Sequence, residues 1–230
     1  MSMIPKVDAS PEPKSEAGRV KDFFQGHAQD FDSIYKRNRK RGFLGRMIDT
    51  TFRKSMFLRF EEVLRHTADP RIETVLDVGC GSGRYCLEFL KQGKRVVGMD
   101  VADGMLALAK QAVAGSPLAQ NILFLQGDYL QHDFHQGFDA ACLMGVLDYI
   151  PDPAAVFRKL KREITKELYA SFPRSSGLLA KQRKLRYALR NCPLYLYSAQ
   201  DIQAIMEACG LEKQYQVKDL GRDYFVKVTL

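Results

Sequence analysis

The chain has 230 residues, of which 46% are hydrophobic, and its 35 Lys and Arg residues against 27 Asp and Glu residues give a formal net charge of +8. This length and apolar content fit one large domain, with or without a small cap, and the lack of an apolar run of about 18 residues argues against a transmembrane helix. The five cysteines are odd in number and never spaced C-x-x-C, which fits reduced thiols in a cytoplasmic protein and argues against a zinc site or a disulfide framework.

The N-terminal quarter of the chain predicts helices rather than strands. Residues 1–17 are rich in Pro, Ser, Lys and Glu and predict a disordered tail, without the apolar h-region of a secretory signal. From Arg19 to Tyr35 apolar and aromatic residues recur at helical spacing, and a second such stripe runs from Phe43 to His66. We therefore expect two helices over residues 18–68, ahead of the first strand.

The positive charge is concentrated in two basic clusters. Residues 36–46 contain six basic residues and no acid, and residues 174–190 contain six more and no acid. A basic surface attracts nucleic acid, anionic lipid or an anionic small molecule, and it also simply keeps a protein in solution. The sequence leaves these alternatives open.

The stretch from residue 74 to residue 100 predicts a βαβ unit. A β-branched strand, Thr74 to Val78, is followed at once by Gly79, Gly81 and Gly83. A helix over residues 84–92 and a second strand, Arg95 to Met99, come next, and Asp100 stands at the carboxyl end of that strand. Such a unit binds a ligand at the carboxyl end of its first strand and places an acid near ribose hydroxyls.

The residues of the glycine turn distinguish between ligands. A dinucleotide turn has the pattern G-x-G-x-x-G, whereas this turn reads G-x-G-x-G and has Arg84 where the last glycine would stand. Asp77 precedes the first glycine by two residues, and a carboxylate there disfavours a pyrophosphate but suits a cation. S-adenosylmethionine (SAM) has a sulfonium, an ammonium and ribose hydroxyls but no phosphate. A generic turn for NAD or a nucleotide is the alternative.

These motifs resemble those of the class I SAM-dependent methyltransferases. DVGCGSG, residues 77–83, resembles motif I of that family, and VVGMD, residues 96–100, resembles its following acidic motif. The resemblance covers about residues 20–230. It implies an α/β, Rossmann-like fold with a seven-stranded, mostly parallel sheet, a terminal antiparallel strand and an N-terminal helical lid over residues 18–68. It also implies SAM as the cofactor and S-adenosylhomocysteine as the product.

The resemblance implies a role for each of a set of residues around the cofactor. Asp100 would bind the ribose, Asp128 would accept a hydrogen bond from the adenine amino group, and Tyr35 of the lid would approach the methionine end. The full set of implied cofactor residues is Tyr35, Asp77, Gly79, Cys80, Gly81, Gly83, Asp100, Val101, Met105, Asp128, Tyr129 and Met144. No metal is expected. For Met105 and Tyr35, ordinary core packing is the alternative.

The rest of the chain alternates helices and strands. The expected strands are residues 122–125, 138–144, 167–172, 212–217 and 224–228, and the expected helices are residues 102–113, 154–162 and 199–209. The last helix has Ser198 as its N-cap and Gly210 as its stop. Residues 174–197 stand where a substrate cap would be inserted. Residues 18–230 are therefore expected to form a single methyltransferase domain.

The stretch LMGVLDYIPDP, residues 143–153, follows the fourth strand, whose end faces the transferring methyl in this family. It resembles the small-molecule branch and lacks the N/D-P-P-Y motif of nucleobase methyltransferases. Asp148 and Tyr149 are therefore the catalytic candidates, for positioning the acceptor or taking its proton. The alternative is that Asp148 caps the next helix and Tyr149 packs in the core. His132 and His135 are further proton acceptors, although their polar loop favours exposure to solvent.

These residues predict a SAM-dependent methyltransferase (EC 2.1.1) that acts on a small, anionic acceptor at oxygen. The SFPR turn, residues 171–174, and the basic cap resemble the magnesium-protoporphyrin O-methyltransferases, whose acceptor is a carboxylate. One alternative is methylation of RNA that is gripped by the basic clusters. Another is a SAM-binding regulatory protein without catalysis. The acceptor atom, the pathway and the oligomeric state are not predicted.

Overall fold

In the computed structural model the described backbone covers residues 15–35 and 43–230, and side chains are described except at residue 17, residues 27–53 and residue 179. The first basic cluster, residues 36–46, lies outside the described side chains, and residues 1–14 of the predicted tail lie outside the described backbone. Within the part that is described, no helix is both long and apolar enough to cross a membrane.

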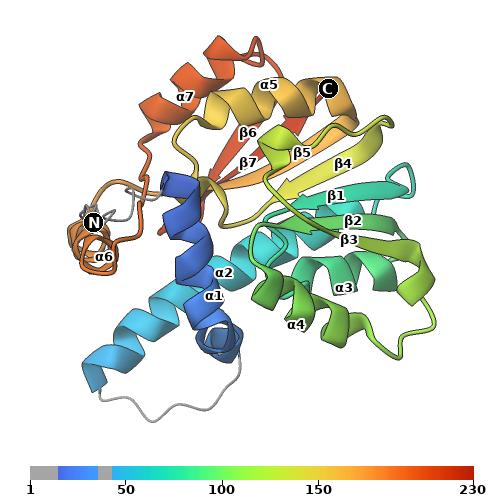
Figure 1. The fold of residues 1–230 in the computed structure, drawn as a ribbon. Helices are drawn as coiled ribbons and strands as arrows, with labels where there is room; N and C mark the ends of the chain where they lie inside the picture. The colour runs from blue at the N-terminus through green and yellow to red at the C-terminus, as the bar shows by residue number, and fades with distance from the viewer. Residues whose placement is uncertain (1–14, 36–42) are drawn as a thin grey trace, which may run out of the picture.

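Seven strands form one sheet in the order β3-β2-β1-β4-β5-β7-β6 (Figure 1). Neighbouring strands pair in parallel except at β7, which is antiparallel to both β5 and β6. The strands are β1 (Thr74–Val78), β2 (Arg95–Asp100), β3 (Ile122–Gln126), β4 (Phe138–Leu143), β5 (Ile164–Pro173), β6 (Tyr215–Asp219) and β7 (Asp223–Thr229). The predicted fold, a seven-stranded and mostly parallel sheet with a terminal antiparallel strand, is confirmed.

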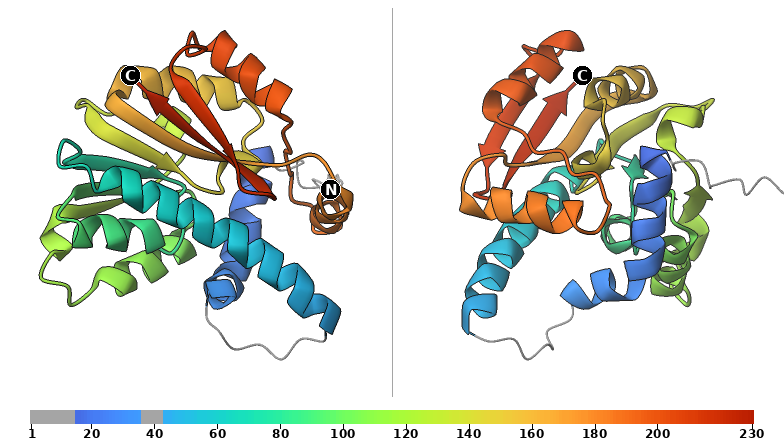
Figure 2. Two further views of the ribbon diagram at one scale, coloured as in Figure 1. Left: turned by 180° about the vertical axis from the view of Figure 1, so that it is seen from behind. Right: turned by 60° about the vertical axis from the view of Figure 1, so that its left-hand side comes forward.

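Helices cover both faces of the sheet, with α5 and α7 on one face and α2, α3 and α4 on the other (Figures 1 and 2). The inward stripes of these helices and the alternating strand residues form two large apolar clusters, one on each face. Helices α1 and α6 lie beyond the carboxyl ends of the parallel strands, and α6 occupies the predicted cap segment. The helices are α1 (Glu16–Tyr35), α2 (Phe43–Thr67), α3 (Arg84–Lys91), α4 (Asp103–Val113), α5 (Pro153–Glu163), α6 (Leu178–Ala188) and α7 (Ala199–Ala208).

Helix α1 begins inside the segment predicted as a disordered tail. Ser15 caps the helix, because its Oγ accepts a hydrogen bond from the backbone N–H of Gly18 (3.2 Å) and its carbonyl accepts one from Arg19 (3.0 Å). Glu16 lies in the first turn, where a carboxylate is favoured by the helix dipole. The prediction of a tail up to residue 17 is therefore wrong at its last two residues.

The start of β5 also differs from the expectation. The expected helix ended at residue 162 and the expected strand began at residue 167, but α5 ends at Glu163 and β5 begins at Ile164 without a loop. Ile164 pairs with Phe138 of β4 and is buried, and the register shifts between Phe138 and Ala140. Ile164 and Thr165 thus belong to the sheet because β5 pairs with β4, and local sequence does not reveal such pairing.

Two glycines of the turn after β1 are required by close packing. A Cβ atom on Gly79 would lie 2.6 Å from Cγ2 of Val146, and one on Gly83 would lie 2.9 Å from Cβ of Ala109. Both glycines also have a positive φ, 71° and 75° respectively. The turn can therefore lie directly against α4 and the loop after β4, which brings three segments together at the carboxyl edge of the sheet.

Candidate active site

A cavity of about 350 Å³ opens at the carboxyl ends of β1, β2 and β4, and α1 forms part of its wall. This volume is within the range of roughly 300–1,000 Å³ that is typical of small-molecule pockets. Ten of the fourteen predicted site residues line the cavity, namely Gly79, Cys80, Gly81, Asp100, Val101, Met105, Asp128, Tyr129, Met144 and Tyr149. The sheet topology brings them together, since the carboxyl ends of parallel strands meet at one edge.

Asp100 joins the glycine turn to the end of β2. Its Oδ2 accepts a hydrogen bond from the N–H of Gly81 (2.9 Å), and its Oδ1 accepts one from Ala102 (2.9 Å). Burial raises the pKa of the Asp100 carboxyl, and these backbone donors oppose the rise. Each carboxylate oxygen can accept more than one hydrogen bond, so the group can also bind hydroxyls in the cavity.

The β2 and β3 side of the cavity combines apolar surface with one acid. Val101 and Met105 line it next to Asp128, whose Oδ1 accepts a hydrogen bond from the N–H of Leu130 (2.9 Å). Tyr129 is almost fully buried, and its hydroxyl donates to Oε2 of Glu163 (2.6 Å), so this hydroxyl is engaged by α5. This end of the cavity has the apolar walls and the acceptor that a nucleobase requires.

Asp77 and Gly83 belong to the motif but do not line the cavity. Asp77 is buried, and its Oδ2 accepts a hydrogen bond from Sγ of Cys86 (3.1 Å). Gly83 packs on Ala109 of α4. Both residues therefore have structural contacts around the turn, and their contact with a ligand stays a prediction.

Asp77 is expected to make the protein less stable as the pH rises. Burial, together with the nearby Asp100, raises the pKa of its carboxyl to about 7, against the opposing hydrogen bond from Cys86. The folded state therefore holds a proton that the unfolded chain releases near pH 4, so stability is lost between about pH 4 and pH 7, on the order of 4 kcal/mol. Urea unfolding of Asp77→Asn should show a flatter pH profile than the wild type. An unchanged profile, with the exposed Asp133→Asn as control, would contradict this assignment.

Arg59 is a cavity residue that the sequence analysis missed. It reaches the end of β4 from α2, where its Nη1 donates to Oγ of Ser171 (3.4 Å) and lies 3.5 Å from Oδ2 of Asp223. Its side chain is only 12% exposed. One signal was available, since Arg59 stands three residues after Met56 and four before Val63, on the predicted inward stripe of α2. A charged residue on such a stripe indicates a buried polar site.

Asp148 is held by the predicted cap rather than by the cavity. It is 4% exposed, does not line the cavity, and forms an ion pair with Nη2 of Arg183 on α6. Burial raises the pKa of its carboxyl, and the Arg183 guanidinium opposes that rise. The next helix is capped by Asp152, whose Oδ1 accepts from the N–H of Ala155 (3.0 Å). The alternative that Asp148 caps this helix is therefore wrong, whereas its role as a proton acceptor stays a prediction, with Arg183 paired to its carboxylate.

Tyr149 does line the cavity and connects it to α1 and α6. Its ring packs edge-on against Phe24 of α1, with 5.0 Å between centroids, and its hydroxyl donates to that of Tyr187 on α6 (3.1 Å). Burial raises the pKa of the Tyr149 hydroxyl well above its usual value. Tyr149 is thus a neutral wall residue at neutral pH.

Helix α1 bridges the two sides of the cavity. On one side Gln25 donates from Nε2 to Oδ1 of Asp103 on α4 (2.5 Å). On the other side Glu16 accepts from the hydroxyl of Tyr195 (2.7 Å), and Arg19 donates to Oδ1 of Asn191 (3.3 Å). Glu16, Val20 and Phe24 also line the cavity, as do Arg84 and Tyr85 of α3, and the sequence analysis did not assign these residues to the site.

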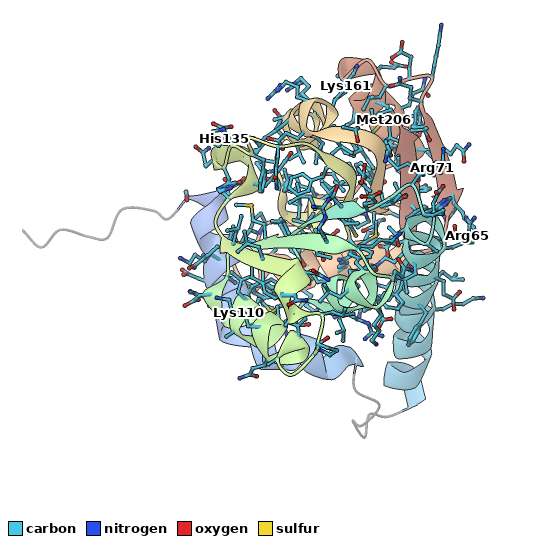
Figure 3. The ribbon with its side chains drawn as sticks, turned by 90° about the vertical axis from the view of Figure 1, so that its right-hand side faces the viewer. Arg65, Arg71, Lys110, His135, Lys161 and Met206 are labelled. Atoms are coloured by element: carbon cyan, nitrogen blue, oxygen red, sulfur yellow. The ribbon has the colours of Figure 1, made fainter. Side chains whose placement is uncertain are left out.

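The remaining candidates do not contribute described side chains to the cavity. Tyr35 is the last residue of α1, and its side chain lies outside the described residues. His132 and His135 do not line the cavity, and His135 lies at the periphery of the molecule (Figure 3). Within the described part of the chain, no group of three or more His, Cys, Asp or Glu residues could hold a metal ion.

Comparisons with known sequences identify the central segment. Residues 75–167 match a protein-family model described as a methyltransferase domain. The ubiquinone biosynthesis O-methyltransferase of Pseudomonas paraeruginosa is 31% identical over 90 residues, which is 39% of this chain and 39% of that protein. Its counterpart in Serratia proteamaculans is 31% identical over 103 residues, 44% of this chain and 42% of that protein. The matches thus span less than half the length of these curated relatives.

Solved structures share the fold over most of the chain. Magnesium protoporphyrin IX methyltransferase from Synechocystis, solved with bound S-adenosylhomocysteine, superposes with a TM-score of 0.72 over 91% of this chain and 97% of that one, at 19% identity. A second structure of that protein, with bound SAM, gives a TM-score of 0.71.

The cavity fits the predicted cofactor in size, in the glycine turn at its floor and in the position of Asp100. The matched segment contains the glycine turn, Asp100 and Asp128, and the sheet around it has the topology found in the superposed methyltransferases. Residues 75–167 therefore match a methyltransferase domain, and the chain as a whole has the fold of the superposed methyltransferases.

Proposed function

We propose that the protein transfers the methyl group of SAM to an oxygen of a small anionic acceptor, most simply a carboxylate. The observation that carries this proposal is the buried Arg59 guanidinium at the β4 end of the cavity. A planar guanidinium binds a carboxylate through two parallel hydrogen bonds. The relatives that are named as O-methyltransferases support oxygen as the accepting atom.

The cavity also supports a direction for the cofactor within it. We assign the adenine to the end formed by Val101, Met105 and Asp128, and the ribose to Asp100. The methionine end then lies near Met144 and Gly79, where the loop after β4 meets the glycine turn. Arg59 stands on the same side as Met144, so an acceptor bound by Arg59 would lie next to the methyl group.

The chain's own contribution to the reaction is then mainly alignment. When bound, SAM supplies a sulfonium methyl group that a nucleophile attacks in line. Arg59 holds the acceptor, Asp100 holds the ribose, and α1 excludes water from above through Phe24 and Val20. Effective molarities of roughly 10⁵ M and above show how much orientation alone can supply.

The state of Asp148 and Tyr149 favours an acceptor that is already ionised. Arg183 engages the Asp148 carboxylate, and burial keeps the Tyr149 hydroxyl protonated. An alcohol would need a group to take its proton, whereas a carboxylate carries none at neutral pH.

We also propose that segment 174–197 is an acceptor cap, anchored by the contacts of Arg183 with Asp148 and of Tyr187 with Tyr149, and that α1 is the lid.

The direct test is transfer of labelled methyl from SAM to matched acceptors, each a carboxylic acid paired with its amide. We expect labelling of the acids only, and release of labelled methanol from the product by alkali, because methyl esters hydrolyse while ethers and N-methyl groups persist. Labelling of the amides, or a label stable to alkali, would contradict a carboxylate acceptor. SAM binding without transfer to any acceptor would favour the SAM-binding regulatory protein.

Replacing Arg59 with glutamine is expected to raise the KM for the anionic acceptor by about 10- to 100-fold, because a charge-assisted pair is lost. The Kd for SAM should change by less than about twofold, since the proposed contacts of SAM lie elsewhere. Arg59→Lys, which keeps the charge near Asp223, should give an intermediate KM. Steady-state kinetics and calorimetry measure the two effects.

The matched control is Arg158→Gln, an arginine on α5 whose partner, Asp152, is exposed and lies outside the cavity wall. This variant should behave like the wild type. A loss of SAM affinity in Arg59→Gln, with an unchanged acceptor KM, would instead assign Arg59 to the carboxylate of the cofactor and remove the main support for an anionic acceptor.

A further inference from the structure

Helix α6 carries a row of exposed leucines. Leu178, Leu185 and Leu189, the last at the C-cap of α6, are 82%, 63% and 80% exposed. Their spacing of seven and four residues places them on one face of the helix. We call these three residues the leucine face. The other large apolar side chains that are exposed among the described residues lie singly on α2, β3, η2 (Tyr129–Gln131) and β6.

The opposite face of α6 anchors it to the domain. Tyr187 is buried against Phe23 of α1 and Tyr149, and Arg183 forms the ion pair with Asp148. Since these contacts use the inner face, the leucine face points away from the domain. Figure 2 shows α6 at the outside of the molecule, beside α1 and away from the packed layers. The row of leucines is therefore not explained by packing within the described chain.

Cations accompany the leucine face. Lys181, Lys184, Arg186 and Arg190 are exposed, and no acidic residue occurs from residue 168 to residue 200. A helix with an apolar face bordered by Lys and Arg is the type that lies in the interface of an anionic membrane. The leucines enter the boundary between headgroups and acyl chains, and the cations meet the headgroup phosphates.

We propose that α6 docks the protein on the surface of an anionic lipid membrane. The positive charge of the segment favours this partner over a second copy of the chain, because two copies of the same basic face repel each other. Nucleic acid would match the cations but would leave the leucines exposed to water. Membrane docking by α6 is independent of which acceptor the cavity binds. Because Tyr149 of the cavity wall is hydrogen-bonded to Tyr187 of α6, docking would bring the cavity close to the membrane.

The chain contains no tryptophan, so a single introduced one reports on its own surroundings. We would prepare Leu185→Trp and, as the matched control, Leu123→Trp on β3, where the leucine is 55% exposed. On vesicles of phosphatidylcholine with phosphatidylglycerol, the emission of the first variant should shift to shorter wavelength and be quenched by brominated lipid. The control should show neither effect. If Leu185→Trp shows the short-wavelength emission of a buried tryptophan in the absence of vesicles, another part of the chain covers the leucine face.

Sedimentation with the same vesicles separates the two contributions. The combined variant Leu178→Ser, Leu185→Ser and Leu189→Ser should lower vesicle binding by about tenfold or more. Lys181→Gln with Lys184→Gln should lower it less and weaken its salt dependence, since two of the exposed cations remain. Lys110→Gln on α4, an exposed lysine in a different part of the molecule (Figure 3), is the charge-matched control. Thermal unfolding should be unchanged in all variants, since the replaced side chains are exposed.

Three outcomes would overturn the proposal. The first is no binding to either anionic or neutral vesicles. The second is vesicle binding that salt abolishes but that the serine variant retains, which would mean that the cations act alone and that the leucines do not enter the membrane. The third is a dimer of the wild type that the serine variant dissociates, which would make the leucine face an interface between two copies of this chain.

Discussion

Replacing Asp100 with alanine is expected to lower the affinity of the protein for SAM by at least about 100-fold. The carboxylate stands at the cavity wall between the N–H groups of Gly81 and Ala102. Each hydrogen bond to a charged group contributes roughly 1.5–3 kcal/mol, so the loss of two ribose hydroxyl bonds gives at least this factor. The variant also frees the Gly81 N–H, which loosens the turn that forms the floor of the cavity. Calorimetric titration with SAM and S-adenosylhomocysteine measures the effect.

The controls for Asp100→Ala separate binding from folding. Asp100→Asn keeps the shape of the side chain but loses the charge, so we expect an intermediate affinity. Asp133→Ala, whose carboxyl is 89% exposed, should bind SAM as the wild type does. Wild-type affinity in a folded Asp100→Ala would show that Asp100 only holds the turn and that the ribose binds elsewhere.

Replacing Arg183 with methionine is expected to destabilise the fold by about 3–5 kcal/mol at pH 8. The side chains of Arg183 and Asp148 are 11% and 6% exposed, so the variant leaves a carboxylate buried without its guanidinium. Burial already raises the pKa of Asp148, and the loss of Arg183 raises it further. An acid with a raised pKa in the folded state costs stability as the pH rises from the unfolded value upward, so the loss should shrink towards pH 4.

A double-mutant cycle tests this interpretation of the pair. Asp148→Asn combined with Arg183→Met should recover most of the lost stability in urea unfolding, because no buried charge remains. The exposed pair Arg158 and Asp152 is the matched control, and Arg158→Met should cost less than about 1 kcal/mol. A cost below about 1 kcal/mol for Arg183→Met alone would mean that water reaches Asp148.

Local sequence determined much of the fold. The strand Thr74–Val78 was predicted with its observed bounds, because its apolar, partly β-branched run is followed directly by glycines. These glycines adopt positive φ, which ends the strand in a turn. Periodicity also located the α-helices other than α6 within about three residues, since an amphipathic stripe is a property of neighbouring residues. The motif around Asp100 indicated the cofactor because the residues expected to bind it lie within a single βαβ unit of consecutive sequence.

Only the tertiary structure decided which distant residues meet. In the folded protein Arg59 of α2 lies at the end of β4, and the Asp148 carboxylate forms an ion pair with Arg183 of α6. Asp77 is buried beneath the glycine turn that follows it. The start of β5 at Ile164 was likewise decided by pairing with β4. These features depend on contacts between residues far apart in the chain, and periodicity and local motifs carry no information about such partners. The sequence by itself therefore determined the fold class and predicted the cofactor, and packing between distant segments decided the charges and contacts around Arg59 and Asp148.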